Sequence, residues 1–273
     1  MPLVGYGVFQ VSPDECERCV RDALAVGYRS IDTAQAYFNE EGVGNAWHKS
    51  DIPRDELFLT TKVWISNAGD KKAAESIDTS LRKLKTDYID LLLIHQPFGD
   101  YYGTYRAMEN ALRDGKVRAI GVSNFYYDRF TDIADQMDIK PAVNQIEVNV
   151  FGQQHRMQEI AEQYGTVLMA WGPLAEGAND LFKNPLLAKI GSKYGKSVAQ
   201  VALRWLIQRG IVVIPKSVRK ERMAENFNIL DFTLSDEDME AICTLDTGHG
   251  IIVDFSDREQ MLGLYNVIKK YKL

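Results

Sequence analysis

The sequence predicts an α/β fold, a single (β/α)8 TIM barrel that occupies residues 1–273. Three observations predict it: eight short apolar segments, a helical pattern after nearly every one of them, and a length of 273 residues. A barrel of this kind typically takes about 250 residues. Glycine and proline are scattered along the chain rather than gathered in a linker, which favours one domain.

The eight apolar segments have the continuous hydrophobicity of strands that are buried on both faces. They are Val4–Gly7, Tyr28–Ile31, Leu57–Thr61, Tyr88–Ile94, Val117–Val122, Ala142–Gln145, Val167–Ala170 and Ile211–Ile214. Strands that alternate with helices form a parallel sheet with right-handed crossovers. Eight such units favour a closed barrel over an open sheet.

Capping signals mark the helices between these strands. Ser12-Pro13-Asp14-Glu15 predicts a capping box at the start of a helix over Pro13–Ala25. Ser235-Asp236-Glu237-Asp238 predicts a similar helix start. Gly115 predicts the end of a helix before the fifth strand, because glycine readily adopts the left-handed conformation.

Charge and cysteine content narrow the partners and the compartment. A formal net charge of −6 argues against nucleic acid or an anionic membrane as the main partner. Cys16 and Cys19 lie in the first predicted helix without a second cysteine pair, so we interpret them as ordinary helix cysteines in a reducing compartment. The chain opens without a signal-peptide pattern, and apolar runs such as Leu91–Ile94 are too short to cross a bilayer, so we expect a cytoplasmic location.

Polar residues follow most of the predicted strands at their carboxyl ends, where barrel enzymes carry their active sites. Asp32 follows the second strand, and Tyr37 comes five residues later. The later strands lead in turn to Lys62, His95, Ser123-Asn124, Gln145, Trp171 and Lys216. Such a series along successive strands predicts one site at one rim of the barrel.

Four of these residues form a set suited to proton transfer. Tyrosine has a pKa near 10, and a lysine ammonium about 4 Å away would favour the phenolate by up to roughly 4 kcal/mol, or about 3 pKa units. Asp32 would hold Lys62 charged and in place, and His95 would orient a substrate oxygen. The set suits a carbonyl or alcohol oxygen. A hydride would then have to come from a cofactor, because no side chain supplies one.

These segments resemble the signatures of the aldo-keto reductase family, and they occur in the family's order through nearly the whole chain. They are Asp32–Tyr37, Lys62–Trp64, Leu92–His95, Gly121–Phe125, Asn144-Gln145 and Ile214–Ser217. The resemblance is to small bacterial-type reductases that act on aldehydes, keto sugars or prostanoid-like ketones, and it does not select among these substrates. It implies NADPH-dependent reduction of a carbonyl to an alcohol. Tyr37 would be the general acid, Lys62 with Asp32 would lower its pKa, and His95 would orient the carbonyl.

The resemblance also implies a coenzyme site. Ser123, Asn124 and Gln145 would hydrogen-bond the nicotinamide carboxamide, and Trp171 would stack on the nicotinamide ring where many members carry tyrosine. Two cations at the adenosine ribose phosphate would favour NADPH over NADH. Lys216, Ser217 and Arg222 are expected to bind the phosphate. Glu225 and Asn226 are expected at the adenine, and Leu174 and Val218 along the same groove.

Phe9, Trp64 and His95 are expected to line the substrate pocket, and Gln96 stands where several members carry tryptophan. Because the first strand begins almost at Met1, the family's N-terminal hairpin plug is expected to be absent or reduced. Residues 247–273 are expected to form a C-terminal tail over the pocket. We expect a monomer that acts on a small-molecule carbonyl substrate.

Two other functions are compatible with parts of the pattern. One is an NADPH-binding regulatory or redox-sensing barrel with little turnover. The other is a lyase or isomerase that uses Lys62 as a Schiff-base amine, which requires a lysine with a depressed pKa. The segment Gly191–Ser197 is one residue short of a P-loop and is expected to lead into a helix over Val198–Gln208. No metal-ligand spacing occurs, so no metal is expected.

Overall fold

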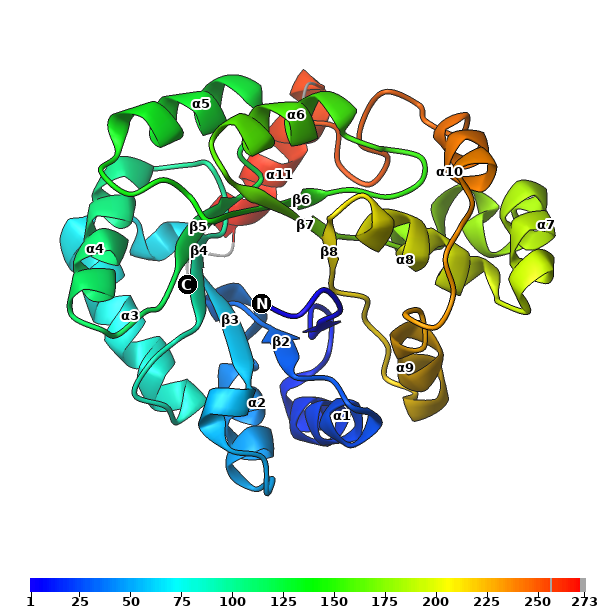
Figure 1. The fold of residues 1–273 in the computed structure, drawn as a ribbon. Coiled ribbons are helices and arrows are strands. Elements are labelled where there is room, and N and C mark those ends of the chain that lie inside the picture. Colours follow the sequence, from blue (N-terminus) through cyan, green and yellow to red (C-terminus); the bar gives the residue numbers. More distant parts are fainter. Residues whose placement is uncertain (256, 271–273) are drawn as a thin grey trace.

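The computed structural model describes residues 1–255 and 257–270, in which parallel strands form one eight-stranded sheet in sequence order (Figure 1). The strands are β1 (Tyr6–Gly7), β2 (Ser30–Asp32), β3 (Phe58–Val63), β4 (Leu91–Ile94), β5 (Ile120–Ser123), β6 (Val143–Glu147), β7 (Val167–Trp171) and β8 (Val212–Val213). The sheet closes on itself, because Val4 bridges Val213 in parallel and the Gly5 amide donates to the Val213 carbonyl at 2.8 Å. The predicted barrel is confirmed.

Most of the helices surround this sheet, whereas α11 overlaps β4–β6 in this view (Figure 1). The helices are α1 (Pro13–Val26), α2 (Glu40–His48), α3 (Asp70–Leu84), α4 (Tyr101–Arg113), α5 (Tyr127–Gln136), α6 (His155–Gln163), α7 (Pro185–Tyr194), α8 (Val198–Gln208), α9 (Lys220–Phe227), α10 (Asp236–Cys243) and α11 (Arg258–Lys270). Short 3-10 helices are η1 (Gln35–Tyr37), η2 (Arg54–Glu56), η3 (Ile65–Asn67) and η4 (Ala175–Lys183). Of the expected tail 247–273, residues 256 and 271–273 lie outside the described part. Across the described residues, no helix is both long and apolar enough to cross a membrane.

Each predicted strand overlaps an observed one, although the ends differ. The sixth was predicted to end at Gln145, whereas β6 continues to Glu147. The first and eighth are shorter than predicted, with only two residues each in β1 and β8. The continuation of β6 brings a buried carboxylate to the rim of the barrel.

The predicted capping box at α1 is wrong. The Ser12 side chain makes no hydrogen bond to the helix backbone, and its hydroxyl instead lies 3.4 Å from the Glu15 carboxylate. A capping box does form at α8, where Ser197 and Gln200 bond each other's backbone amides. Helix α8 begins and ends as predicted. The P-loop-like segment Gly191–Ser197 comprises the last turn of α7 and the short link to α8.

Two other helix boundaries are confirmed. The Ser235 hydroxyl accepts from the Asp238 amide at 3.2 Å at the start of α10. Gly115 follows the end of α4 with φ of 76°, the left-handed conformation that glycine adopts without strain.

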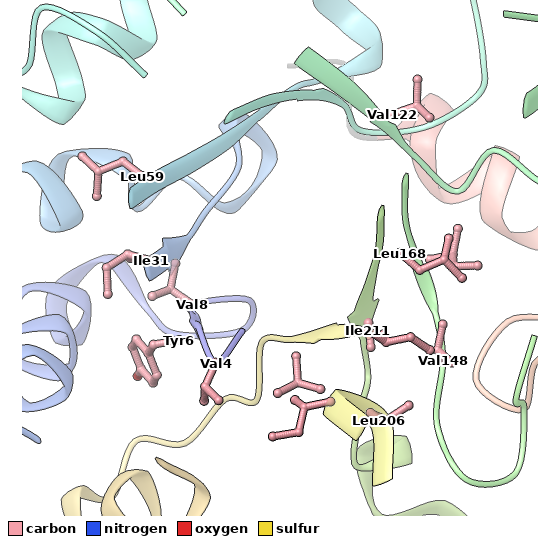
Figure 2. Packing of buried hydrophobic residues seen from close by; sticks show 14 of the residues in the cluster. Val4, Tyr6, Val8, Ile31, Leu59, Val122, Val148, Leu168, Leu206 and Ile211 are labelled. Carbon is pink, nitrogen blue, oxygen red and sulfur yellow. The ribbon is translucent and has the colours of Figure 1, made fainter. Parts of the chain in front are cut away.

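Alternating side chains of the strands divide the core into two clusters. Leu92 and Ile94 of β4 join the larger cluster between sheet and helices, part of which Figure 2 shows with Ile31, Leu59 and Val122. Leu91 and Leu93 belong to a smaller cluster with Val143, Met169, Val212 and Ile214. Because the smaller cluster fills the inside of the barrel, a polar site has to lie at a barrel end.

Candidate active site

The predicted catalytic residues lie on the inner side of the barrel at the carboxyl ends of its strands. Lys62 pairs in register with the inward-facing Leu93, and His95 comes two residues after Leu93 along the chain. Gln145 pairs with inward-facing Met169. The twofold alternation of side chains along a strand therefore brings these polar groups together above the apolar inner cluster.

The structure brings Asp32, Tyr37, Lys62 and His95 together. The Lys62 ammonium donates to Asp32 Oδ1 at 2.5 Å, to the Thr33 carbonyl at 2.9 Å and to the Tyr37 hydroxyl at 3.4 Å. The rings of Tyr37 and His95 meet edge to face with centroids 5.4 Å apart. Lys62 and Asp32 are almost completely buried, so their attraction is weakly screened.

Lys62 remains an ammonium in these surroundings. Burial lowers its pKa, but Asp32 and Tyr37 more than offset burial and raise the pKa above the ordinary 10.5. A Schiff-base lysine needs the opposite shift, toward neutrality. The lysine-amine alternative therefore disagrees with the geometry.

The pKa of Tyr37 differs from the expectation. Burial raises it above the ordinary 10.0, Lys62 lowers it, and Asp32 raises it again, so the balance is a raised pKa rather than a lowered one. The phenol is therefore protonated at neutral pH, which a proton donor requires. Lys62 is placed to stabilise the phenolate that remains after the proton has left.

His95 is a neutral imidazole at pH 7. Burial, and then the charge of Lys62, lower its pKa well below the ordinary 6.5. Its Nδ1 atom is buried and has no hydrogen-bond partner among the described residues. Trp64 packs against the His95 ring at 4.9 Å, and Phe9 packs against the Tyr37 ring at 5.1 Å. The residues predicted for the substrate pocket thus surround the predicted acid.

The residues predicted for the nicotinamide form one hydrogen-bond network. Asn124 Nδ2 donates to the His95 carbonyl at 3.1 Å, and Asn124 Oδ1 accepts from Trp171 Nε1 at 2.8 Å. The Ser123 hydroxyl donates to the Gln145 carbonyl at 2.8 Å. Gln145 Nε2 donates to Asp32 Oδ2 at 2.7 Å. This network therefore joins the proposed coenzyme residues to the proton-transfer group.

The residues predicted for the coenzyme phosphate lie beside the start of α9. Lys216 and Arg222 are exposed, and neither forms an ion pair within residues 1–255 and 257–270. The Ser217 hydroxyl accepts from the Arg219 amide at 3.1 Å. The other predicted residues are half-buried or buried around them: Leu174, Val218, Glu225 and Asn226.

Sequence reasoning missed three features of this end of the barrel. Gln35 Oε1 accepts from the Trp64 amide and from Asn67 Nδ2, each at 2.9 Å, and so holds the turn that carries Trp64. Arg219 and Lys220 add exposed cations next to Lys216. Glu147 is fully buried at the end of β6. Alternation from Gln145 would have indicated Glu147, had the predicted strand continued two residues further.

In the described ranges, His, Cys, Asp and Glu side chains do not gather in any group of three that could hold a metal ion. Cys16, Cys19 and Cys243 are free thiols.

A sequence profile of the Aldo/keto reductase family matches residues 4–247. The chain belongs to the aldo/keto reductase family. It is 45% identical to the glyoxal reductase of Bacillus subtilis, over 90% of this chain and 89% of that protein. It is 40% identical to the methylglyoxal reductase DkgA of Escherichia coli, over 91% and 90% of the two chains. Membership makes this protein an NADPH-dependent oxidoreductase of the aldo-keto reductase class.

Solved structures resemble this reductase throughout. An aldo-keto reductase from a deep-sea metagenome library superposes with a TM-score of 0.91 at 44% identity, covering 94% of this chain and 96% of that one. A Bombyx mori aldo-keto reductase, solved in complex with NADP, superposes with a TM-score of 0.88 at 35% identity and covers 95% and 93%. The barrel, its order of strands and its class of chemistry are thus shared with known enzymes.

Proposed function

We propose that this reductase converts small aldehydes and α-dicarbonyl compounds, such as glyoxal and methylglyoxal, into alcohols. The observation that carries the proposal is the buried contact of Lys62 with both Asp32 and Tyr37 beside a neutral His95. The names of the bacterial relatives, glyoxal reductase and methylglyoxal reductase, support the substrate class.

The residues present fit NADPH. Lys216 and Arg222, exposed and without ion-pair partners among the described residues, are the donors that a ribose phosphate requires. Ser123, Asn124 and Gln145 offer hydroxyl and amide groups for a carboxamide, and Trp171 offers a flat ring. The remaining residues proposed to hold the coenzyme are Leu174, Ser217, Val218, Glu225 and Asn226. When bound, NADPH supplies the hydride that reduces the carbonyl carbon.

The protein's own residues supply the proton and its control. His95, neutral and edge-on to Tyr37, would donate a hydrogen bond to the substrate carbonyl oxygen and orient it. Tyr37, protonated at neutral pH, would give its proton to that oxygen. Lys62 would stabilise the phenolate, and Asp32 would keep Lys62 in place. Proton transfer from a positioned acid typically contributes about 10²–10⁴-fold in rate.

The pocket favours small substrates without a strict shape. Phe9 is 48% exposed, so one wall of the pocket faces solvent. Gln96 stands where several family members carry tryptophan, and its buried Oε1 has no partner in the described part of the chain. We propose that small aldehydes with a second carbonyl oxygen bind here as well as simple ones.

We also propose that the protein acts as a monomer in the cytoplasm. All three cysteines are free, as expected of a reducing compartment. Light scattering at the mass of one chain, 30.9 kDa, would support the monomer. A mass of two chains would contradict it.

The test is the loss of NADPH absorbance with a panel of aldehydes, methylglyoxal and ketones. Lys216→Ala and Arg222→Ala should each raise KM for NADPH about 10- to 100-fold, because each variant loses one charge-assisted hydrogen bond to the phosphate. KM for NADH should change little, because NADH lacks that phosphate. Lys71→Ala, an exposed lysine on α3, is the matched control. NADPH binding without turnover of any carbonyl would favour a regulatory barrel, and a failure to bind NADPH would refute the coenzyme site.

A further inference from the structure

Glu147 is a buried carboxylate that the mechanism above does not use. It is the last residue of β6, lies opposite Trp171 of β7 in register, and is fully buried. Because it follows Gln145 by two residues, it faces the same inner side of the barrel, one layer closer to the rim. No lysine, arginine or histidine of the described ranges forms an ion pair with it.

Backbone amides of the C-terminal tail surround this carboxylate instead. Ile251 donates to Oε1 at 2.8 Å, Ile252 donates to Oε1 at 3.1 Å and to Oε2 at 3.2 Å, and Val253 donates to Oε2 at 3.0 Å. Asn149 Nδ2 adds a bond to Oε1 at 3.1 Å. Consecutive amides that converge on one anion form a nest, and bonds to an ionised acceptor are about twice as strong as neutral ones.

The turn that makes this nest requires a glycine. A Cβ atom at Gly250 would lie 2.5 Å from the Val253 carbonyl and 3.0 Å from Glu147 Oε2. A larger residue would therefore push the tail away from the carboxylate. The close approach of Gly250 and the three following amides together define a specific docking point for the tail on β6.

The docked tail packs against the turns that carry the proposed coenzyme residues. Ile252 Cδ1 lies 2.8 Å from where a Cβ atom of Gly172, the residue after Trp171, would be. The ring of Phe255 packs against the ring of Tyr126, with the two centroids 5.0 Å apart. Tyr126 follows Asn124 by two residues along the chain. The family profile matches residues 4–247, so the clamped segment lies just outside the matched range.

We propose that Glu147 is a positioning residue that clamps residues 251–253 over the carboxyl end of the barrel and thereby sets the size of substrate that binds well. Because Ile252 lies beside Gly172, the residue after Trp171, a bulky aldehyde would reach Ile252 and gain contacts with it, whereas methylglyoxal would be too small to do so. Only the kinetic part of this inference rests on the proposed function. The clamp itself is a structural statement that can be tested without turnover.

Hydrogen exchange tests the clamp directly. In Glu147→Gln one carboxylate oxygen becomes an amide NH2 group, which donates hydrogen bonds and cannot accept them, so the amides of residues 251–253 should exchange at least about 10-fold faster. The amides of Val143–Ile146 in β6 should keep their wild-type rates. Glu162→Gln, on the exposed side of α6, is the matched control and should change neither set. Unchanged exchange at 251–253, or equal acceleration in both sets, would overturn the proposal.

Kinetics test the consequence for substrate size. With 4-nitrobenzaldehyde, Glu147→Gln should raise KM about 5- to 10-fold with kcat within about twofold, the pattern of lost uniform binding. With methylglyoxal both constants should stay within about twofold of wild type.

Ile252→Ala should reproduce the rise in KM for 4-nitrobenzaldehyde while leaving amide exchange in β6 unchanged. If Glu147→Gln does not fold, Ile252→Ala still tests whether the tail sets substrate size. A loss of kcat shared by both aldehydes, or no effect of Ile252→Ala, would contradict the proposal. Absence of turnover in the wild type would refute the proposed function but leave the exchange result valid.

Discussion

Two buried aspartates hold cations at opposite ends of this barrel. Asp90 stands just before β4 at the amino end, where it accepts from Arg54 at 2.7 Å, from Arg118 at 3.0 Å and from the Leu59 amide at 2.9 Å. Asp32 stands at the carboxyl end and accepts from Lys62 at 2.5 Å. Burial and charge pairing are similar at the two ends.

The two networks differ in where they end. At the amino end, Arg54 also donates to the Leu57 and Tyr88 carbonyls, and arginine does not titrate in proteins. At the carboxyl end, Lys62 reaches the Tyr37 hydroxyl, and the neighbouring His95 keeps an unpartnered Nδ1. A closed network of arginines stabilises the fold, whereas a network that ends in titratable groups can move a proton.

Removing the cation at the carboxyl end should have the largest effect. Lys62→Met leaves Asp32 buried without its partner, which should lower the free energy of unfolding by about 3–5 kcal/mol. The rate of carbonyl reduction should fall about 10³-fold, because the phenolate of Tyr37 loses its stabilising charge. Urea unfolding and NADPH oxidation measure the two effects.

The double variant Asp32→Asn/Lys62→Met separates the effect of Lys62 on stability from its effect on the reduction rate. Because no uncompensated buried charge remains, stability should recover most of the loss while activity stays low. Recovery of both would mean that Lys62 acts only through stability.

Removing the cation at the amino end should affect stability alone. Arg54→Met should lower the free energy of unfolding by about 2–3 kcal/mol, less than a fully orphaned charge because Arg118 still pairs with Asp90. The kcat for carbonyl reduction should remain within about twofold of wild type. A large fall in kcat with unchanged NADPH binding would break the distinction between the two ends.

The pH dependence of stability should also reflect the carboxyl end. The pKa of His95 is lowered well below 6.5 in the folded state, so below pH 6.5 the unfolded chain binds a proton that the folded chain does not. Stability from this group is therefore present above pH 6.5 and is lost as pH falls toward the folded pKa, by up to about 1.4 kcal/mol per pH unit. Urea unfolding between pH 7 and 5 should show a flatter slope in His95→Gln, and equal slopes would contradict the assignment.

The strands and the proximity of the proposed catalytic residues could be predicted from the sequence for one physical reason. Strands buried on both faces form continuous apolar runs, and in a parallel barrel their carboxyl ends must meet at one rim. Asp32, Lys62 and His95 come directly after such runs, so their proximity follows from topology. Tyr37 follows the second strand by five residues, so its place in the set is predicted from its chemistry beside a lysine and from the family resemblance rather than from periodicity.

Other features depend on tertiary geometry that periodicity does not contain. The sequence of α1 has the residues of a capping box, yet the Ser12 hydroxyl lies beside the Glu15 side chain instead of the backbone. Glu147 was missed because a strand end was placed two residues early, and its partners are amides more than a hundred residues away. The raised pKa of Tyr37 results from a balance of burial, Lys62 and Asp32 that requires distances.

The most direct test of the central claim is the rate of NADPH oxidation with methylglyoxal in wild type and Tyr37→Phe, with NADPH binding followed by quenching of tryptophan fluorescence. Removing the hydroxyl leaves the ring to pack on Phe9 and His95. If Tyr37 is the acid, kcat falls about 10²–10⁴-fold while the Kd for NADPH and the unfolding midpoint stay near wild type. A Tyr37→Phe variant that binds NADPH and still reduces methylglyoxal at the wild-type rate would contradict the account.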